Sequence, residues 1–176
     1  KTINDTISPR IKDNDIVIEE LNMSDEEIKE ITKIHIVACG SAYHTGVTAK
    51  YVIEGLARIP VEVDVASEFR YRDPILQKGN MVIVISQSGE TADTLAALRE
   101  SRERGFKVLG IVNVVGSSIA READSVMYTW AGPEIAVATT KAYSAQLTAL
   151  YMLAMKFARV RGTIDQEKFA GMLTDL

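Results

Sequence analysis

Residues 86–91, SQSGET, combine hydroxyl groups with a glycine in a manner typical of phosphate-binding turns. Ser86, Ser88 and Thr91 supply hydroxyl groups, and Gly89 permits backbone conformations that a side chain would forbid. The apolar run MVIVI precedes this turn, and helix-compatible residues follow it. A strand-to-helix turn presents free N–H groups and the positive end of the helix dipole to an anion. The pattern therefore predicts a phosphate site, and the absence of lysine from the turn argues against a P-loop.

Two further polar turns follow predicted strands. CGSAYHTG contains Ser41, and NVVGSS contains Asn113, Ser117 and Ser118. In parallel sheets ligands bind beyond the carboxyl ends of the strands, so Ser41 would join the SQSGET hydroxyl groups if the first and third strands are neighbours. For Ser41 alone, helix capping and ligand binding are both open interpretations. The three residues of NVVGSS are interpreted as turn chemistry, with a place along the same edge.

Other chemistry-bearing residues form no familiar catalytic set. His35 lies inside a strand and is interpreted as structural, whereas His44, early in a helix, is a weaker acid–base candidate. Cys39 is the single cysteine and is predicted to be a buried, inert thiol. Zinc-ligand spacing, GxSxG and GxGxxG do not occur in the sequence. No metal or cofactor is therefore predicted, and the charged segment ASEFRYRD is interpreted as a salt-bridged surface turn.

The elements that must position these residues alternate between strand and helix. Ser24 and Glu27 form a predicted capping box, and Gly105 and Gly162 are expected to end the two later long helices. The predicted strands are 34–40, 61–66, 81–85, 107–114 and 125–130. The predicted helices are 24–33, 43–57, 91–104, 117–124 and 139–161. A short helix or turn is also predicted before Pro74. Strands that are apolar throughout indicate a parallel sheet covered on both faces. We therefore predict a doubly wound α/β fold, in which the apolar last helix is either central to the core or an oligomer interface.

The composition fits one globular domain. The chain has 176 residues, of which 47% are hydrophobic and 25% are charged, and a net charge of −4. This charge balance argues against nucleic acid and anionic membranes as partners. The polar start is unlike a signal peptide, and LTALYMLAM is too short to span a bilayer. A cytoplasmic location is expected, and residues 1–22 are predicted to be a loosely structured or extended leader.

Four segments together resemble a known family. ACGSAYHTG, VEVDVASEFRYRD, SQSGETADTLAALR and GPEIAVATTKAYSAQL occur in this order. Their sequence and spacing resemble the isomerase portion of the glutamine:fructose-6-phosphate aminotransferases, which are also called glucosamine-6-phosphate synthases. This portion contains two sugar-isomerase (SIS) domains, and the resemblance is to the first of them. The resemblance runs from about residue 15 to the end. It implies a flavodoxin-like, five-stranded parallel sheet that binds a hexose 6-phosphate, namely fructose-6-phosphate, glucose-6-phosphate or glucosamine-6-phosphate.

The resemblance also assigns site residues. It implies that the phosphate is held by Ser86, Gln87, Ser88 and Thr91, with Ser41 contributing from the first loop and Gly89 and His44 as weaker candidates. The main chain of Val137 would face the sugar. The family commonly has Cys-Gly-Thr-Ser where this chain has Cys39, Gly40, Ser41 and Ala42. Because Ala42 lacks a hydroxyl, the contact made there is missing or is replaced by a backbone group or water.

The same resemblance implies partners outside this sequence. Residues 1–22 would be a leader linking to a glutaminase domain, and 23–176 would be the SIS domain. The catalytic groups for sugar-ring opening and proton transfer would lie in the second SIS domain, so no catalytic residue is assigned here and the isolated chain is expected to bind sugar phosphate without turnover. A homodimer is expected. Two alternatives remain: a stand-alone SIS-type isomerase, lyase or deglycase with His44 or Glu90 as base, and a sugar-phosphate sensor attached to a DNA-binding module.

Overall fold

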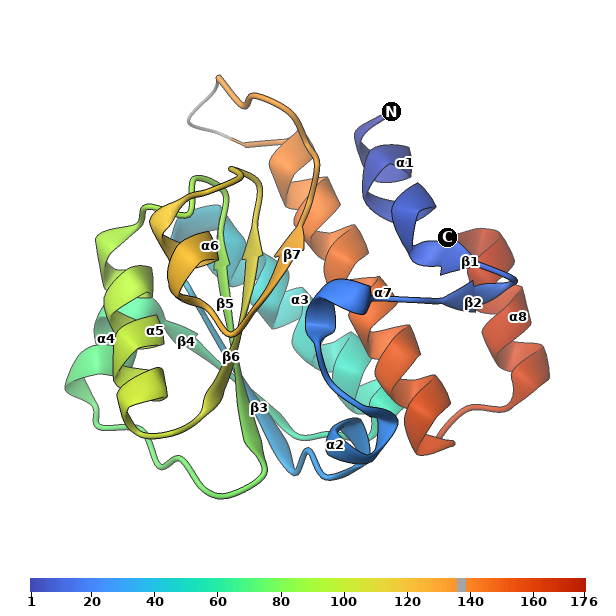
Figure 1. Ribbon diagram of the computed structural model, residues 1–176, viewed down its shortest axis with the longest axis horizontal. Coiled ribbons are helices and arrows are strands. Elements are labelled where there is room, and N and C mark those ends of the chain that lie inside the picture. Colours follow the sequence, from blue (N-terminus) through green and yellow to red (C-terminus); the bar gives the residue numbers. More distant parts are fainter. Residues whose placement is uncertain (136–138) are drawn as a thin grey trace.

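A five-stranded parallel sheet forms the centre of the computed structural model, which describes residues 1–135 and 139–176 (Figure 1). In spatial order the strands are β4 (Val61–Val65), β3 (Lys33–Ala38), β5 (Asn80–Ser86), β6 (Lys107–Val112) and β7 (Ser125–Tyr128). This flavodoxin-like order confirms the predicted fold class. It also places the first and third strands of the sheet side by side, with Ala38 paired to Ile85.

Helices cover both faces of the sheet. One face carries α3 (Gly40–Ala57) and α7 (Lys141–Arg161), and the other carries α4 (Ala66–Tyr71), α5 (Ala92–Glu103) and α6 (Ser118–Glu122) (Figure 1). The predicted helices are all present, although α3 begins at Gly40, three residues before the predicted start. Gly40 has φ +58°, a left-handed conformation that turns the chain from the strand directly into the helix. A final helix, α8 (Gln166–Asp175), was not predicted.

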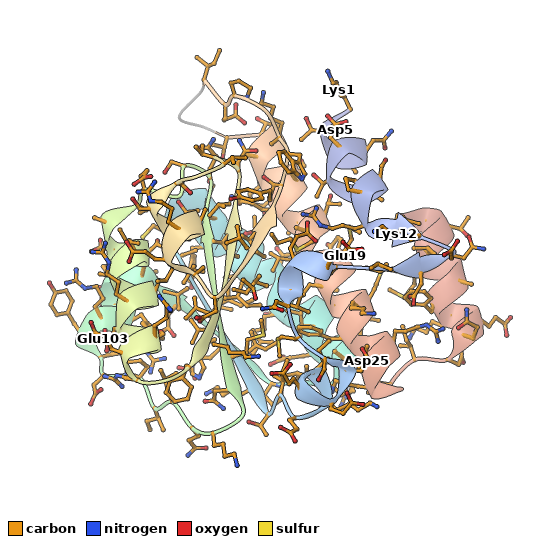
Figure 2. All side chains as sticks on the ribbon, in the orientation of Figure 1. Lys1, Asp5, Lys12, Glu19, Asp25 and Glu103 are labelled. Carbon is orange, nitrogen blue, oxygen red and sulfur yellow. The ribbon has the colours of Figure 1, made fainter. Side chains whose placement is uncertain are left out.

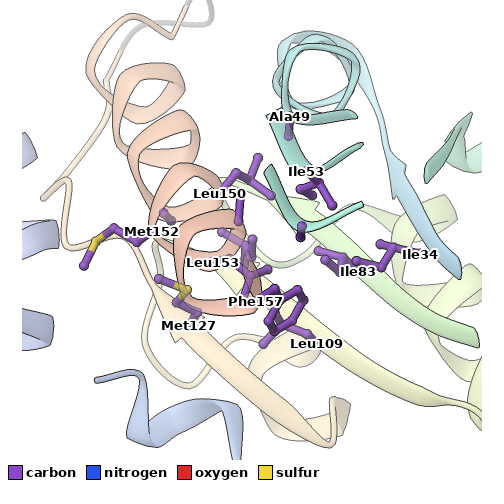
Figure 3. Packing of buried hydrophobic residues seen from close by; sticks show 14 of the residues in the cluster. Ile34, Ala49, Ile53, Ile83, Leu109, Met127, Leu150, Met152, Leu153 and Phe157 are labelled. Atoms are coloured by element: carbon purple, nitrogen blue, oxygen red, sulfur yellow. The ribbon is translucent and has the colours of Figure 1, made fainter. Parts of the chain in front are cut away.

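The larger core lies between the sheet and the α3–α7 pair (Figure 3). Ile34 and Ile83 project from the strands toward Ile53 of α3 and Phe157 of α7, and all four side chains are fully buried. Alternate strand residues, such as Val37 and Val82, project toward α4 and α5 instead. Because both faces of the central strands are buried, their sequence is apolar without alternation. The interpretation of the last predicted helix as central to the core is confirmed.

The prediction of a loosely structured leader is wrong. Its elements are α1 (Thr2–Ile7), a 3-10 turn (Ser8–Arg10), a hairpin of β1 (Ile11–Lys12) and β2 (Asp15–Ile16), and a second 3-10 turn (Glu19–Leu21). Lys12 and Glu19, labelled in Figure 2, form an exposed ion pair. Ile16 and Leu21 are buried in the larger core, and α1 packs along α7. These spaced apolar residues fix the segment, although its overall composition is polar.

Arg10 anchors the leader to the sheet. Its side chain is only 1% exposed and donates hydrogen bonds to the Thr6 and Tyr128 carbonyls, each at 2.8 Å, and to the Glu20 carboxylate at 2.8 Å. A buried guanidinium needs such partners because an unpaired buried charge is strongly destabilising. The leader is therefore held at the carboxyl end of β7.

Replacing Ser24 with alanine is expected to lower the free energy of unfolding by about 1 kcal/mol, the usual value of an N-cap. Ser24 precedes α2 (Asp25–Lys29), where its hydroxyl accepts from the Glu27 N–H at 3.2 Å and its own N–H donates to the Glu27 carboxylate at 2.8 Å. Urea denaturation measures the loss. The exposed Ser8, substituted in the same way, is the control, and equal stability of both variants would contradict the capping role.

Candidate functional site

The SQSGET turn connects β5 to α5 and is closed by its own hydroxyl groups. Ser86 is the last residue of β5 and Thr91 is the N-cap residue of α5. The two side-chain oxygens lie 2.9 Å apart, and the Ser86 oxygen also accepts a hydrogen bond from the Gly89 N–H at 3.0 Å. Because Ser86 is only 3% exposed, its hydroxyl shapes the turn from beneath. The predicted residues Ser86 and Thr91 are therefore brought together.

Gly89 lies at the tightest point of the turn. Its φ is +67°, and a Cβ atom there would lie 2.0 Å from the Ser117 oxygen and 2.5 Å from the Ser117 Cβ. The Gly89 carbonyl accepts from the Ile119 N–H at 3.0 Å, which ties the turn to α6. Only glycine satisfies both the conformation and the close approach. Among the described residues, the buried Ser117 hydroxyl has no hydrogen-bond partner.

The remaining turn side chains are partly open to solvent. The Ser88 hydroxyl accepts from the Glu90 N–H at 3.2 Å, and Gln87 is half-buried beside a hollow of about 570 Å³. The Glu90 carboxylate accepts from the Ser118 N–H at 2.7 Å, and hydrogen bonding from Ser118 lowers the pKa of Glu90. Glu90 is thus engaged at the start of α6 and poorly suited to act as a base, which requires a pKa near the working pH.

The first polar turn leaves the sheet beside the SQSGET turn, because Ala38 pairs with Ile85. Its helix α3 runs over one face of the sheet and α5 runs over the opposite face, so the two turns border the topological switch point (Figure 1). A crevice at such a point is the usual ligand site of open α/β sheets, and the N-termini of both helices favour an anion there. Both turns therefore bring hydroxyl and N–H groups to this edge of the sheet, and neither contains a lysine or an arginine.

The three candidates in the first turn occupy different environments. Ser41 is exposed, and its oxygen lies 3.0 Å from the Thr139 hydroxyl oxygen. Ala42 is 6% exposed and packs into the larger core. His44 is exposed, with its ring edge-on to Tyr43. Ser41 is therefore the residue of this turn that is best placed at the crevice. The predicted sugar contact Val137 lies outside the described residues.

Cys39 was predicted to be buried, and that prediction is wrong. The residue is only partly buried at the N-cap position of α3, with its sulfur 3.8 Å from the Thr94 hydroxyl. The strand ends at Ala38, two residues before the predicted end at residue 40, so Cys39 already belongs to the turn.

A second polar cluster lies away from the crevice. Candidate ligand atoms of His35, Glu62 and Asp64 lie within 4.8 Å of one another. Lys33 pairs with Glu62, and Arg72 pairs with both Glu62 and Asp64, so a cation would have to displace existing ion pairs. Burial, reinforced by the charge of Lys33, lowers the pKa of His35, and its Nε2 lies 3.3 Å from the Asn80 side-chain oxygen. The burial and the Nε2 contact agree with the structural role predicted for His35, although its buried Nδ1 has no hydrogen-bond partner among the described residues.

Charged residues of ASEFRYRD do form the predicted salt-bridged surface. Arg70 pairs with Asp93 at 3.2 Å, and Asp73 pairs with Arg104 at 2.5 Å. Exposed pairs of this kind contribute little individually. Through these two pairs the segment connects α4 and the residues after it to both ends of α5.

Two residues gain importance only in the structure. Thr139 reaches Ser41 across 98 positions, and Asn113 links three groups of the segment that follows β7. Asn113 was interpreted as turn chemistry, and Thr139 was not singled out. A polar residue directly after a strand was the available signal for Asn113, whereas contacts between distant loops have no local signature.

Comparisons with known proteins agree with this geometry. The SIS domain family model matches residues 27–156. The chain is 60% identical over 169 residues to glutamine–fructose-6-phosphate aminotransferase [isomerizing] of Clostridium tetani, a match that covers 96% of this chain and 28% of that protein. It therefore spans less than a third of the length of this curated relative.

Solved structures share the fold. The C-terminal domain of glucosamine-fructose-6-phosphate aminotransferase from Francisella tularensis superposes with a TM-score of 0.92 at 39% identity, covering 99% of this chain and 49% of that one. A putative phosphosugar isomerase from Clostridium difficile matches the fold with a TM-score of 0.77 at 24% identity, over 85% of this chain and 44% of that one. The family model covers most of the chain, including all five strands of the sheet and the SQSGET turn. The chain belongs to the SIS domain family.

Proposed function

We propose that this chain binds the phosphate of a hexose 6-phosphate as the first SIS domain of an isomerising glutamine–fructose-6-phosphate aminotransferase. The observation that carries the proposal is the SQSGET turn at the switch point of the sheet. The hydroxyl groups of Ser86, Ser88 and Thr91 form hydrogen bonds within this turn, and Gly89 gives it its left-handed backbone conformation. Neutral donors at a helix N-terminus suit a phosphate dianion. In the parent enzyme, this domain would serve the formation of glucosamine-6-phosphate from fructose-6-phosphate and glutamine.

The partners follow from the same proposal. The anchored leader would connect to a glutaminase domain, and a second SIS domain would supply the catalytic groups. We also propose a homodimer and a cytoplasmic location, the latter supported by the free thiol of Cys39. Among the described residues, no helix has both the length and the apolar composition needed to cross a membrane.

The alternatives are less well supported by the contacts. A stand-alone isomerase needs a base, and Glu90 is occupied by the Ser118 N–H. His44 is exposed, and its ring lies edge-on to Tyr43. A sensor is less well supported because the Clostridium tetani relative that is 60% identical to this chain is an aminotransferase.

Calorimetric titration of the chain with fructose-6-phosphate, glucose-6-phosphate and glucosamine-6-phosphate is expected to show binding in the millimolar range. Fructose without phosphate is the matched control and is expected to give no signal, because the turn recognises the anion. Absence of heat with all three phosphates would contradict the proposal. A parallel assay for isomerisation is expected to show no turnover, and measurable turnover would favour the stand-alone enzyme.

A further inference from the structure

Asn113 joins the phosphate turn to the segment that follows β7. It is the first residue after β6, and its backbone N–H donates to the Gln87 carbonyl at 3.2 Å. Its side-chain oxygen accepts from the Ala131 N–H at 2.7 Å and from the Thr129 hydroxyl at 3.2 Å, while its side-chain nitrogen donates to the Gly132 carbonyl at 2.8 Å. The amide side chain supplies both the acceptor oxygen and the donor nitrogen that this arrangement uses.

The segment that Asn113 holds contains a residue with an unfavourable backbone conformation. Trp130, between Thr129 and Ala131, has φ +51°, which is uncommon for a bulky residue and persists only when its surroundings enforce it. On its other side the leader holds the end of β7, where Thr6 donates to the Thr129 carbonyl and Arg10 to the Tyr128 carbonyl. The 129–132 turn is thus fixed between the leader and Asn113.

The fixed turn forms one wall of a hollow beside the phosphate turn. Gln87 and Asn113 line this hollow of about 570 Å³ together with Trp130, Gly132 and Glu134. The side of the hollow nearest the phosphate turn is therefore built from the residues that directly follow β5 and β6, and the opposite side from the segment after β7. The distance between the two sides depends on the side-chain contacts of Asn113.

We propose that Asn113 is a positioning residue, which holds the 129–132 turn at a fixed distance from the phosphate turn and thereby shapes the part of the site that receives the sugar. The inference rests on the proposed function for its ligand. Asn113 contacts the phosphate turn only through its backbone, and its side chain acts on the 129–132 turn. A side-chain change should therefore alter sugar binding without altering phosphate binding.

The single tryptophan of the chain, Trp130, reports on this turn directly. Asn113→Ala removes three side-chain hydrogen bonds and is expected to increase the quenching of Trp130 fluorescence by acrylamide, because the turn relaxes. Asn113→Asp keeps both acceptor contacts but places a carboxylate opposite the Gly132 carbonyl, so an intermediate increase is expected. Ser24→Ala, at the opposite end of the strands, is the control for general destabilisation and should leave the quenching unchanged.

Titrations separate positioning from loss of stability. Asn113→Ala is expected to weaken fructose-6-phosphate binding about tenfold, while inorganic phosphate binding stays within about twofold of the unmodified chain. Equal loss of both ligands, or no loss of either, would overturn the positioning role, and so would unchanged Trp130 quenching. If the unmodified chain binds no hexose phosphate, the proposed function fails, and the quenching comparison still decides whether Asn113 holds the turn.

Discussion

Replacing Gly89 with alanine is expected to abolish detectable hexose phosphate binding and to destabilise the fold by about 2–4 kcal/mol. Two costs combine. Alanine is strained at φ +67°, and its Cβ would lie 2.0 Å from the Ser117 oxygen. If α6 moves away, the Ile119 N–H loses the Gly89 carbonyl; if the turn moves, the Gly89 N–H loses the Ser86 oxygen. Either movement displaces the N–H groups that face the crevice. Urea denaturation and calorimetry measure the two effects.

Two further variants separate the costs at Gly89. Gly105 has φ +84°, and a Cβ atom there would have no neighbour within 4 Å, so Gly105→Ala carries the conformational cost alone, about 1 kcal/mol. Combining Gly89→Ala with Ser117→Gly removes the clash and should restore part of the stability as a positive coupling energy. If Gly89→Ala binds fructose-6-phosphate normally and is no less stable than Gly105→Ala, the close approach has no functional importance.

Local signals in the sequence were sufficient for most of the fold. The capping box of Ser24 and Glu27 forms as predicted, and Gly105 and Gly162 adopt positive φ at helix ends. The apolar strands and the sheet class were also predicted correctly, because burial on both faces leaves a continuous apolar pattern. At the site, the contact between Ser86 and Thr91 spans only five positions, so it is also a contact between residues close in the sequence.

Long-range partners explain what the sequence did not reveal. The leader looked unstructured because its stability depends on Arg10 reaching the Tyr128 carbonyl, 118 positions away. The Ser41–Thr139 contact and the hydrogen bond between the Asn113 side chain and the Ala131 N–H likewise join separate loops. The final helix is a different case: Asp165 caps it by accepting from the Lys168 N–H at 2.7 Å, a local signal that was present and overlooked.

Substituting Ser86 with alanine is expected to weaken fructose-6-phosphate binding by about ten- to a hundredfold, the range for losing a hydrogen bond to a charged group. The same change leaves the buried Gly89 N–H without its acceptor, which costs about 1–3 kcal/mol of stability. Thr91 also loses its partner at 2.9 Å and is free to rotate. Ser88→Ala should weaken binding with a smaller loss of stability, because Ser88 is partly exposed and lies above the turn.

A matched control distinguishes binding from stability at Ser86. Ser101 is a fully buried serine of α5, and its hydroxyl donates to the Ala97 carbonyl of the same helix at 2.8 Å. Ser101→Ala should therefore change stability while leaving the affinity for fructose-6-phosphate unaltered. Calorimetry at a temperature where all variants are folded makes the comparison. If Ser86→Ala retains normal affinity, its hydroxyl only closes the turn, and the phosphate must be held by Ser88, Thr91 and the N–H groups of α5.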